Sequence, residues 1–345
     1  MRVSQVLCAA GPVDAVTNQG LACRELFDGW GWQGADYSAV IAPGIGRDTI
    51  HHLHELTPRH DEVLLLHYSG YARGLEPLFG SAPRSLLISH NITPAKYFWE
   101  HEPVDAVRCE LGRGQLAELA GSIGALAGVS DFNARELREL SSRDAAVIPV
   151  LFDRSALPPA GPPPEGPPTV LFVGRLTPHK RQDLVIRAFA RYRRECPDAR
   201  LVLVGVPITP SFGEQLRQLA DELAPGAVTF EAGIPPQRLA GHYRAAHAFL
   251  CLSEHEGFCV PLLEAFHYGV PVIARDRGAV AEVVGDAAVL LGEGDGLQTI
   301  AELLRIVVDD AELRGELAAR GERRLAVYDH AATAAKLRSA LEGLA

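Results

Sequence analysis

The chain has 345 residues, of which 47% are hydrophobic and 22% charged, and its formal net charge is −10. This balance is typical of a globular chain with room for two domains. A net anion is repelled by a polyphosphate, and the basic residues are scattered rather than gathered in a patch, so we expect no nucleic-acid partner.

The cysteines and the start of the chain bear on the cellular compartment. Six cysteines occur without a C-x-x-C pair, which in a chain of this length indicates reduced thiols rather than disulfides or a zinc site. The first ten residues form a short strand-like run instead of a signal peptide, and no apolar stretch reaches about 18 residues. We therefore expect a cytoplasmic protein without a transmembrane segment.

Short apolar runs alternate with helical patterns along the whole chain. Continuous apolar runs of this kind, separated by helices, are typical of parallel sheets that are buried on both faces. Helical spacing of apolar residues is clearest over residues 182–196 and 330–344. The runs cover residues 3–9, 37–42, 62–68, 85–90, 145–150, 169–174, 200–205, 227–232, 248–253, 270–274 and 288–291.

A proline-rich segment divides these runs into two groups. Residues 157–169 read LPPAGPPPEGPPT, and proline both removes backbone donors and favours extended geometry, so we expect a linker there. A TIM barrel would lack such a break in its middle. The predicted fold class is therefore α/β with two doubly wound parallel sheets, in domains 1–156 and 170–327.

The strongest local motif is VLFVGRLTPHKRQDLVIRAF, residues 170–189. A buried strand ends at Gly174, and Arg175 and Lys180 follow in the loop before the next helix. Ligands of open parallel sheets bind beyond the carboxyl ends of the strands, and two cations in that place can neutralise a diphosphate. Taken alone, the same loop could equally be an ordinary solvated connection.

A second motif, SEHEGFCVPLLEAFHYGVPVIA, occupies residues 253–274 between two predicted strands. Pro261 suits the first position of a helix, whose free N–H groups would then bind an anion. Glu256 precedes that helix and Glu264 lies one turn inside it, where carboxylates can accept hydrogen bonds from sugar and ribose hydroxyls. A glutamate that merely complements the helix dipole would explain Glu264 alone.

Together the two motifs carry a family resemblance. Gly174-Arg175 to Lys180 matches a G-R-x(4)-K loop, and Glu256 to Glu264 matches an E-x(7)-E spacing, so the chain resembles a retaining family-four glycosyltransferase of the GT-B fold. The resemblance implies that Arg175 and Lys180 bind the diphosphate of a nucleotide sugar, Glu264 the ribose and Glu256 the donor sugar. The donor-binding set that it implies is Gly11, Gly174, Arg175, Lys180, Ile234, Glu256, Gly257, Phe258, Cys259, Val260 and Glu264.

The resemblance is weaker in the N-terminal half, which in this family binds the acceptor. His90 follows a predicted strand, where related enzymes place a histidine near the donor sugar, so the implied catalytic group is Arg175, Lys180, Glu256 and His90. The loop at residues 10–19 contains Gly11, and its side chains are candidates for acceptor or sugar contacts: Asp14, Thr17 and Asn18.

The GT-B fold implies two Rossmann-like domains facing a cleft. In this family the last helix commonly crosses back to the N-terminal domain, so we expect residues 328–345 to pack there. The hinges are then expected near Pro158 and Val327.

Two other patterns are interpreted as incidental. Gly29, Gly31 and Gly34 match a dinucleotide fingerprint but precede a strand instead of following one, which indicates a turn. The HHLH tract, His51 to His54, has no distant partner ligands, and we expect it on an exposed helix. The absence of a D-x-D motif agrees with a cationic cradle for the diphosphate, so we expect no metal and no cofactor.

The family resemblance implies transfer with retention of anomeric configuration, which we interpret as front-face attack. Guanine-specific relatives carry an acidic residue in the loop after the strand at 227–232, whereas here that loop contains Gly233, Ile234 and two prolines. This favours a UDP or dTDP sugar over a GDP sugar, with a glycan or a small natural product as acceptor. The alternatives are a non-catalytic nucleotide-sugar-binding protein and a GT-B sugar epimerase.

Overall fold

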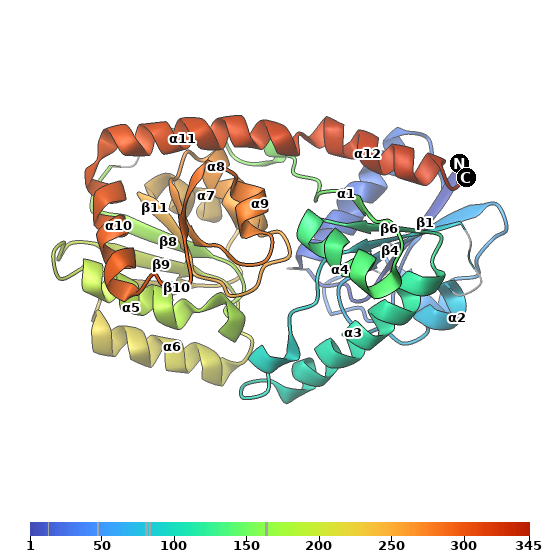
Figure 1. Cartoon of the computed structure of the whole chain (residues 1–345), viewed down its shortest axis with the longest axis horizontal. Coiled ribbons are helices and arrows are strands. Elements are labelled where there is room, and N and C mark those ends of the chain that lie inside the picture. Colours follow the sequence, from blue (N-terminus) through green and yellow to red (C-terminus); the bar gives the residue numbers. More distant parts are fainter. Residues whose placement is uncertain (13, 47, 80–81, 83, 163–164) are drawn as a thin grey trace. The chain divides into compact units, whose positions relative to one another are not determined.

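The computed structural model describes residues 1–12, 14–46, 48–79, 82, 84–162 and 165–345, and its internal contacts divide the chain into two compact units. The first unit comprises Met1–Lys96, Pro103–Leu151 and His330–Ala345, and the second comprises Tyr97–Glu102 and Phe152–Asp329. Each unit contains one sheet in which every strand pair is parallel, so the predicted α/β class with two parallel sheets is confirmed (Figure 1).

The first unit has a seven-stranded sheet in the order β3-β2-β1-β4-β5-β6-β7. Its strands are β1 (Arg2–Leu7), β2 (Asp36–Ser38), β3 (His51–His52), β4 (Glu62–Tyr68), β5 (Ser85–Ser89), β6 (Ala125–Gly128) and β7 (Ala146–Val147). Its helices are α1 (Ala15–Gly29), α2 (Leu75–Phe79), α3 (Pro103–Ser122), α4 (Asp131–Ser141) and α12 (His330–Glu342).

The central strand of this sheet shows why its sequence forms a strand. All seven residues of β4 are buried, as expected for a strand covered on both faces, and its bounds coincide with the predicted run 62–68. Leu64 and Leu66 pack with Leu87 of β5 and Leu126 of β6 in one apolar core. This core fixes the carboxyl ends of β4 and β5, where His67 and His90 lie.

The second unit has a six-stranded sheet in the order β10-β9-β8-β11-β12-β13. Its strands are β8 (Thr169–Val173), β9 (Arg200–Val204), β10 (Val228–Glu231), β11 (Ala248–Cys251), β12 (Val272–Arg275) and β13 (Ala288–Leu291). Its helices are α5 (Gln182–Tyr192), α6 (Pro210–Leu223), α7 (Pro236–Ala245), α8 (Val260–His267), α9 (Val280–Val284), α10 (Leu297–Asp309) and α11 (Ala311–Leu325).

The helices of the second unit cover its sheet. Helices α5 and α6 lie side by side, and α10 contacts α5 (Figure 1). Phe189 of α5 and Leu304 of α10 join Phe172 of β8 and Leu250 of β11 in one buried cluster. Because the core holds β8 and β11 as neighbours, the loops that follow these two strands lie at the same edge of the sheet.

Several predicted elements differ from the observed ones. The run 37–42 forms a strand of only three residues, and the run 145–150 forms one of two. His51 and His52 lie in β3 rather than on an exposed helix, and only His54 is helical, in a short 3₁₀ turn. Pro261 occupies the second position of α8 rather than the first, because the helix begins at Val260.

Within the predicted linker 157–169, Pro163 and Pro164 lie outside the described residues, and the other residues up to Pro168 form neither helix nor strand. The glycine tract ends α1 and turns into β2, and both Gly31 and Gly34 have positive φ, as the turn interpretation requires. Across the described ranges, no helix combines the length and apolar composition that crossing a membrane would need.

Candidate functional site

The two motifs of the C-terminal half meet in the second unit. β8 leads into the loop with Arg175 and Lys180, and the neighbouring β11 leads into the loop with Glu256. The loops are joined by their backbones, because the Glu254 N–H donates to the His179 carbonyl at 2.7 Å. They are also joined by side chains, with 2.7 Å between Lys180 Nζ and Glu256 Oε1.

The Lys180–Glu256 ion pair is largely withdrawn from solvent. The two side chains are 18% and 7% exposed. Burial alone would raise the pKa of Glu256, but Lys180 and a hydrogen bond from Ser253 hold it below its usual value. Burial alone would likewise lower the pKa of Lys180, yet Glu256 raises it. Both groups are therefore charged near neutral pH, and each depends on the other.

The backbone of Glu256 is fixed by a close neighbour. Gly278 has a φ of +61°, and a Cβ at this position would lie 2.2 Å from the Glu256 carbonyl oxygen. The Ala279 N–H donates to that same oxygen at 2.9 Å. A side chain on residue 278 would push the loop away, so glycine is required for this approach. On the other side, Ser253 Oγ donates to Glu256 Oε1 at 2.7 Å.

Glu264 lies on α8, and no basic side chain of the described residues forms an ion pair with it. Its Oε2 accepts a hydrogen bond from the hydroxyl of the buried Tyr243 at 2.7 Å, and Tyr243 stacks on Tyr268 with 5.1 Å between ring centroids. Burial raises the pKa of Glu264, and the Tyr243 hydrogen bond only partly offsets that rise. A hydroxyl group that donates a hydrogen bond to Glu264 would therefore stabilise its ionised form.

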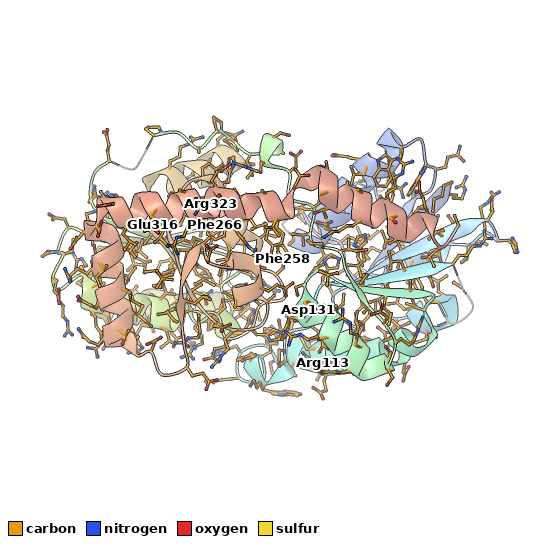
Figure 2. The ribbon with its side chains drawn as sticks, turned by 45° about the horizontal axis from the view of Figure 1, so that its top comes forward. Arg113, Asp131, Phe258, Phe266, Glu316 and Arg323 are labelled. Atoms are coloured by element: carbon orange, nitrogen blue, oxygen red, sulfur yellow. The ribbon has the colours of Figure 1, made fainter. Side chains whose placement is uncertain are left out.

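Helix α8 is held against α11 by a tight contact. Phe266 lies beneath α11 in Figure 2, and a Cβ on Gly321 of α11 would come within 2.8 Å of its ring. The close approach of the two helices fixes the axis of α8, and with it the position of Glu264.

The loop after β8 holds buried polar atoms that lack partners. Gln182 Nε2 donates to the Arg175 carbonyl at 3.1 Å, while the Arg175 side chain is exposed. Thr177 Oγ1, His179 Nδ1 and Gln182 Oε1 are buried without a hydrogen-bond partner among the described residues. Burial, and then the charge of Lys180, lower the pKa of His179 to about 3, so its ring is neutral.

The start of α8 has strained backbone geometry. Cys259 caps the helix with a φ of +74°, and Arg181, which caps α5, has a φ of +52°. They are two of the four non-glycine residues with positive φ in the described chain, and such strain concentrates at functional sites. Gly257 and Val260 are partly exposed on either side of the buried Phe258, labelled in Figure 2.

Sequence reasoning missed one contact at this helix start. The cysteines were interpreted as separate buried thiols, whereas the sulfur atoms of Cys251 and Cys259 lie within 4.8 Å of one another. Cys251 ends β11 and Cys259 caps the next helix, so a single β-strand-to-helix loop brings them together. Their spacing of eight residues across one loop was the signal available.

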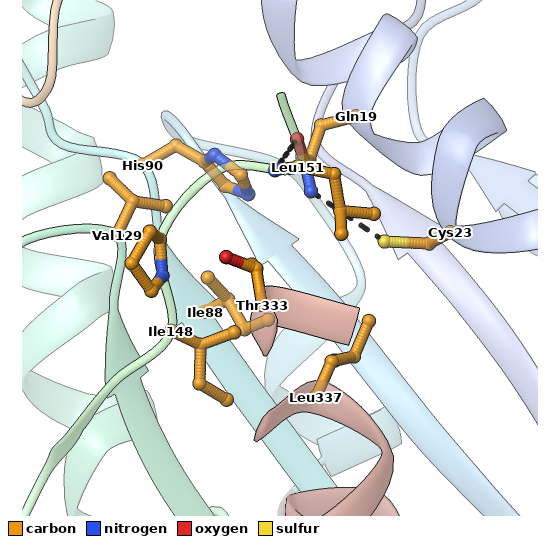
Figure 3. A pocket seen from close by; sticks show the side chains of 10 residues that line it. Gln19, Cys23, Ile88, His90, Val129, Ile148, Leu151, Thr333 and Leu337 are labelled. Carbon is orange, nitrogen blue, oxygen red and sulfur yellow. Dashed lines mark hydrogen bonds between the residues drawn. The ribbon is translucent and has the colours of Figure 1, made fainter. Parts of the chain in front are cut away.

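His90 lies in the first unit, at the end of β5, and lines a small pocket with Cys23, Val129 and Thr333 (Figure 3). Its Nε2 is 3.0 Å from Nδ1 of the fully buried His67, whose Nε2 is 2.8 Å from Oε1 of Gln5. Gln5 Nε2 in turn donates to Asp36 Oδ1 at 2.9 Å. A buried chain of hydrogen bonds therefore runs from His90, which follows β5, through β4 and β1 to Asp36 of β2.

The chain sets the tautomer of His90. Gln5 Nε2 also donates to the carbonyl of Gly20, so its amide orientation is fixed by two acceptors and Oε1 must accept from His67 Nε2–H. Burial, and then His90, keep the pKa of His67 well below its usual value, so the ring is neutral and Nδ1 is an acceptor. His90 then donates through Nε2–H, and Nδ1 carries no proton.

The remaining candidates divide between the units. Asp14 caps α1 by accepting from Thr17 N at 2.7 Å and from Thr17 Oγ1 at 2.8 Å, and the Gly11 N–H donates to Thr17 Oγ1 at 3.0 Å. These groups order the loop after β1, whereas Asn18 is exposed. Val13 of the same loop lies outside the described residues. Ile234 is partly buried in the loop between β10 and α7 of the second unit.

Comparison with known proteins confirms the resemblance. Residues 153–324 match the family model of glycosyl transferases group 1. This span contains both charged motifs of the second unit.

Two curated relatives are similar over parts of the chain. It is 32% identical over 256 residues to a D-inositol 3-phosphate glycosyltransferase of Kineococcus radiotolerans, covering 65% of this chain and 57% of that protein. It is 36% identical over 127 residues to a GDP-mannose-dependent α-(1-6)-phosphatidylinositol monomannoside mannosyltransferase of Mycolicibacterium smegmatis, covering 34% and 32%. The chain thus spans between one third and somewhat more than half of these relatives.

A solved structure shares the fold over the whole chain. Anabaena HepE, in complex with UDP-glucose, superposes with a TM-score of 0.77 at 16% identity, over 99% of this chain and 100% of that one. At this identity the likeness establishes the fold alone, which is GT-B.

Proposed function

We propose that this chain, which belongs to the glycosyl transferases group 1 through residues 153–324, transfers a sugar from a nucleotide diphosphate sugar to a hydroxyl acceptor. The observation that carries the proposal is the buried Lys180–Glu256 pair in the segment that leads into α8, where burial also raises the pKa of Glu264. A burial cost of this kind is characteristic of a site built for a polar ligand.

The leaving group is the diphosphate, whose negative charge grows as the bond to the anomeric carbon breaks. Lys180 carries three N–H donors, and only one is needed for Glu256, so the other two can serve phosphate oxygens. Arg175 supplies an exposed guanidinium in the same loop, and the N–H groups at the start of α8 add partial positive charge. Stabilisation of developing charge is the main catalytic term in this scheme.

The carboxylates bind hydroxyl groups in the same scheme. Glu264 accepts from the ribose hydroxyls, which supply the hydrogen bonds that a buried carboxylate lacks, and Glu256 accepts from the donor sugar. His90 offers Nδ1 as a hydrogen-bond acceptor, because the buried chain of hydrogen bonds leaves that nitrogen without a proton. The reaction proceeds by front-face attack with retention of configuration, and it uses no metal and no cofactor.

The loop before α7 and the names of the relatives bear on the choice of donor and acceptor. The loop at Ile234 carries no acidic residue before α7, which favours UDP or dTDP sugars, while the relative from Mycolicibacterium smegmatis is named for GDP-mannose. The acceptor is a glycan or a small hydroxyl compound, and the relatives' names add phosphorylated or lipid-linked inositol to that class. Six free cysteines support a cytoplasmic reaction.

A thermal-shift series with UDP, dTDP and GDP tests the donor site. The matched pair is Arg175→Met against Arg187→Met, because both arginines are exposed and Arg187 lies on α5 away from the strand end. We expect a nucleoside diphosphate to stabilise the wild type and Arg187→Met, and to stabilise Arg175→Met less. If none of the three nucleotides stabilises the wild type, the proposal is wrong.

Two further assays separate the alternatives. A non-catalytic nucleotide-sugar-binding protein would be stabilised by its ligand yet leave every donor–acceptor mixture unchanged. A GT-B epimerase would isomerise or hydrolyse the donor without an acceptor. For a transferase, proton NMR couplings of the product report the anomer, and an inverted anomer would exclude front-face attack.

A further inference from the structure

The start of α8 brings three potential metal ligands together in the second unit. The sulfur atoms of Cys251 and Cys259 and one carboxylate oxygen of Glu256 all lie within 4.8 Å of one another, and no other group of three such ligands occurs among the described residues. Cys251 and Glu256 are buried, and Cys259 is partly exposed. The three side chains therefore converge on one point, and Cys259 is the one of the three residues that is partly exposed.

We propose that Cys251, Cys259 and Glu256 form a binding site for a thiophilic divalent cation of the Zn²⁺ type. In a tetrahedral zinc site with Zn–S of about 2.3 Å and Zn–O of about 2.1 Å, neighbouring ligand atoms stand roughly 3.5–3.8 Å apart. The observed separations come within about 1 Å of this geometry, which side-chain rotation about χ1 can close. Three protein ligands leave a fourth position for water or an external ligand.

The charges of the site favour a divalent cation. Binding replaces the two thiol protons with one M²⁺, so the two thiolates form metal–sulfur bonds and two protons leave for solvent. The net charge of the buried cluster then stays unchanged: two thiolates and the Glu256 carboxylate balance M²⁺ and Lys180. A monovalent or trivalent ion would leave an uncompensated charge in a desolvated place, which is costly.

Lys180 does not close the site. Both hydrogen bonds that the structure gives the Glu256 carboxylate fall on Oε1, from Lys180 Nζ and Ser253 Oγ. Oε2 accepts none from any described residue, so one carboxylate can carry the lysine on one oxygen and the cation on the other.

The backbone of Cys259 supports a role for its thiol. The left-handed conformation disfavours residues with a Cβ by about 1–2 kcal/mol, and glycine would adopt it freely. The sequence nevertheless has a cysteine there, with its sulfur directed at a second thiol. A purely structural cap would need no thiol.

The cation site shares Glu256 and Cys259 with the proposed donor site but takes no part in the proposed transfer, which uses no metal, so its test measures the metal alone. The full chain is reduced with a phosphine, freed of metal, checked for free thiols and titrated with Co²⁺. We expect a thiolate-to-cobalt charge-transfer band in the near ultraviolet and intense ligand-field bands in the visible, saturating at about one equivalent and bleached by Zn²⁺. The histidine tract at His51 to His54 would give no thiolate band.

Three variants make the result specific. Cys259→Gly removes one ligand and also relieves the positive φ, so it should fold at least as well as the wild type and lose the charge-transfer band. Cys251→Ser should lose it too, whereas Cys196→Ser, which changes a half-buried thiol between α5 and β9, should keep it. The proposal is overturned if the reduced wild type shows no band, if the band survives in Cys259→Gly, or if Cys251 and Cys259 remain a disulfide under the phosphine.

Discussion

Replacing Lys180 by Met should destabilise the second unit strongly, because it leaves Glu256 charged and buried. The substitution keeps most of the aliphatic stem and removes only the ammonium group that lies 2.7 Å from the carboxylate. Breaking a buried ion pair on one side costs about 3–5 kcal/mol. Because Lys180 is 18% exposed and Ser253 still donates to Glu256, we expect the lower end, about 3 kcal/mol.

This free energy converts to a measurable shift. The second unit has roughly 180 residues, which at about 2.1 cal/mol/K per residue makes 3 kcal/mol equal to a drop of about 8 °C in its Tm. The matched control is Arg277→Met in the same unit, whose ion pair with Glu293 has the same 2.7 Å separation but side chains that are 34% and 81% exposed. An exposed pair contributes at most about 1 kcal/mol, so the control should shift by less than about 3 °C.

The charge argument also predicts the double variant and the pH dependence. Lys180→Met with Glu256→Gln removes both charges and should be less destabilised than the sum of the single variants. The pKa of Glu256 is depressed in the folded wild type, so the pair's stability is present above the unfolded glutamate pKa and is lost as pH falls through the folded one. The gap between wild type and Lys180→Met should therefore narrow in acid. Two calorimetric results would refute the reasoning. One is a loss of Tm in Lys180→Met no larger than that in Arg277→Met, and the other is a double variant whose loss of stability equals the sum of the losses in the two single variants.

Three further outcomes follow from the same geometry. Glu264→Gln should leave the Tm unchanged or raise it, and it should weaken nucleotide binding. The pKa of Glu264 is raised in the folded protein, so ionisation of this carboxyl lowers the stability as pH rises from the unfolded pKa through the folded one. A Tm loss of several degrees near neutral pH in calorimetry would contradict this. Gly278→Ala should lower the free energy of unfolding, measured by chemical denaturation, by about 2–4 kcal/mol. The control Gly226→Ala should lower it by about 1 kcal/mol, because Gly226 has a φ of +70° but its added Cβ meets nothing within 4 Å. Equal losses of stability would exclude a role for the contact with Glu256. Nitrogen NMR should show His90 protonated at Nε2 and bare at Nδ1 from pH 5 to 8, since burial lowers its pKa to about 4, and a titration near 6.5 would disprove the buried chain.

The parts of the fold that the sequence predicts are those where local pattern and burial agree. The run 62–68 is apolar apart from Glu62 and His67, and it becomes β4 with the same bounds, because burial on both faces of a sheet favours apolar residues at successive positions. β6 escaped prediction because ALAG has neither β-branched residues nor alternation, and Gly128 is small so that α4 can approach it. β3 escaped because two histidines give no strand signal.

The candidate site divides in the same way. The spacing motifs predict which charged residues follow which strands, and parallel topology then brings Lys180 to Glu256 because β8 and β11 are neighbours. Contacts that depend on side-chain direction stayed hidden, such as His67 to Gln5, since a buried histidine within a strand reads as one more covered position. The cap of α1 was readable, because an Asp directly before a helical run is a capping signal, yet Asp14 was interpreted as a ligand contact.

The division of the first unit into three chain segments has a consequence for synthesis on the ribosome. Thr333, Leu337 and Leu341 of α12 are almost fully buried within that unit, so its core is incomplete until residues 330–345 have been made. The second unit has all its residues by Asp329 and can fold while its partner still waits. The half of the protein that is translated first is therefore expected to finish folding last, and until then part of its apolar core stays uncovered.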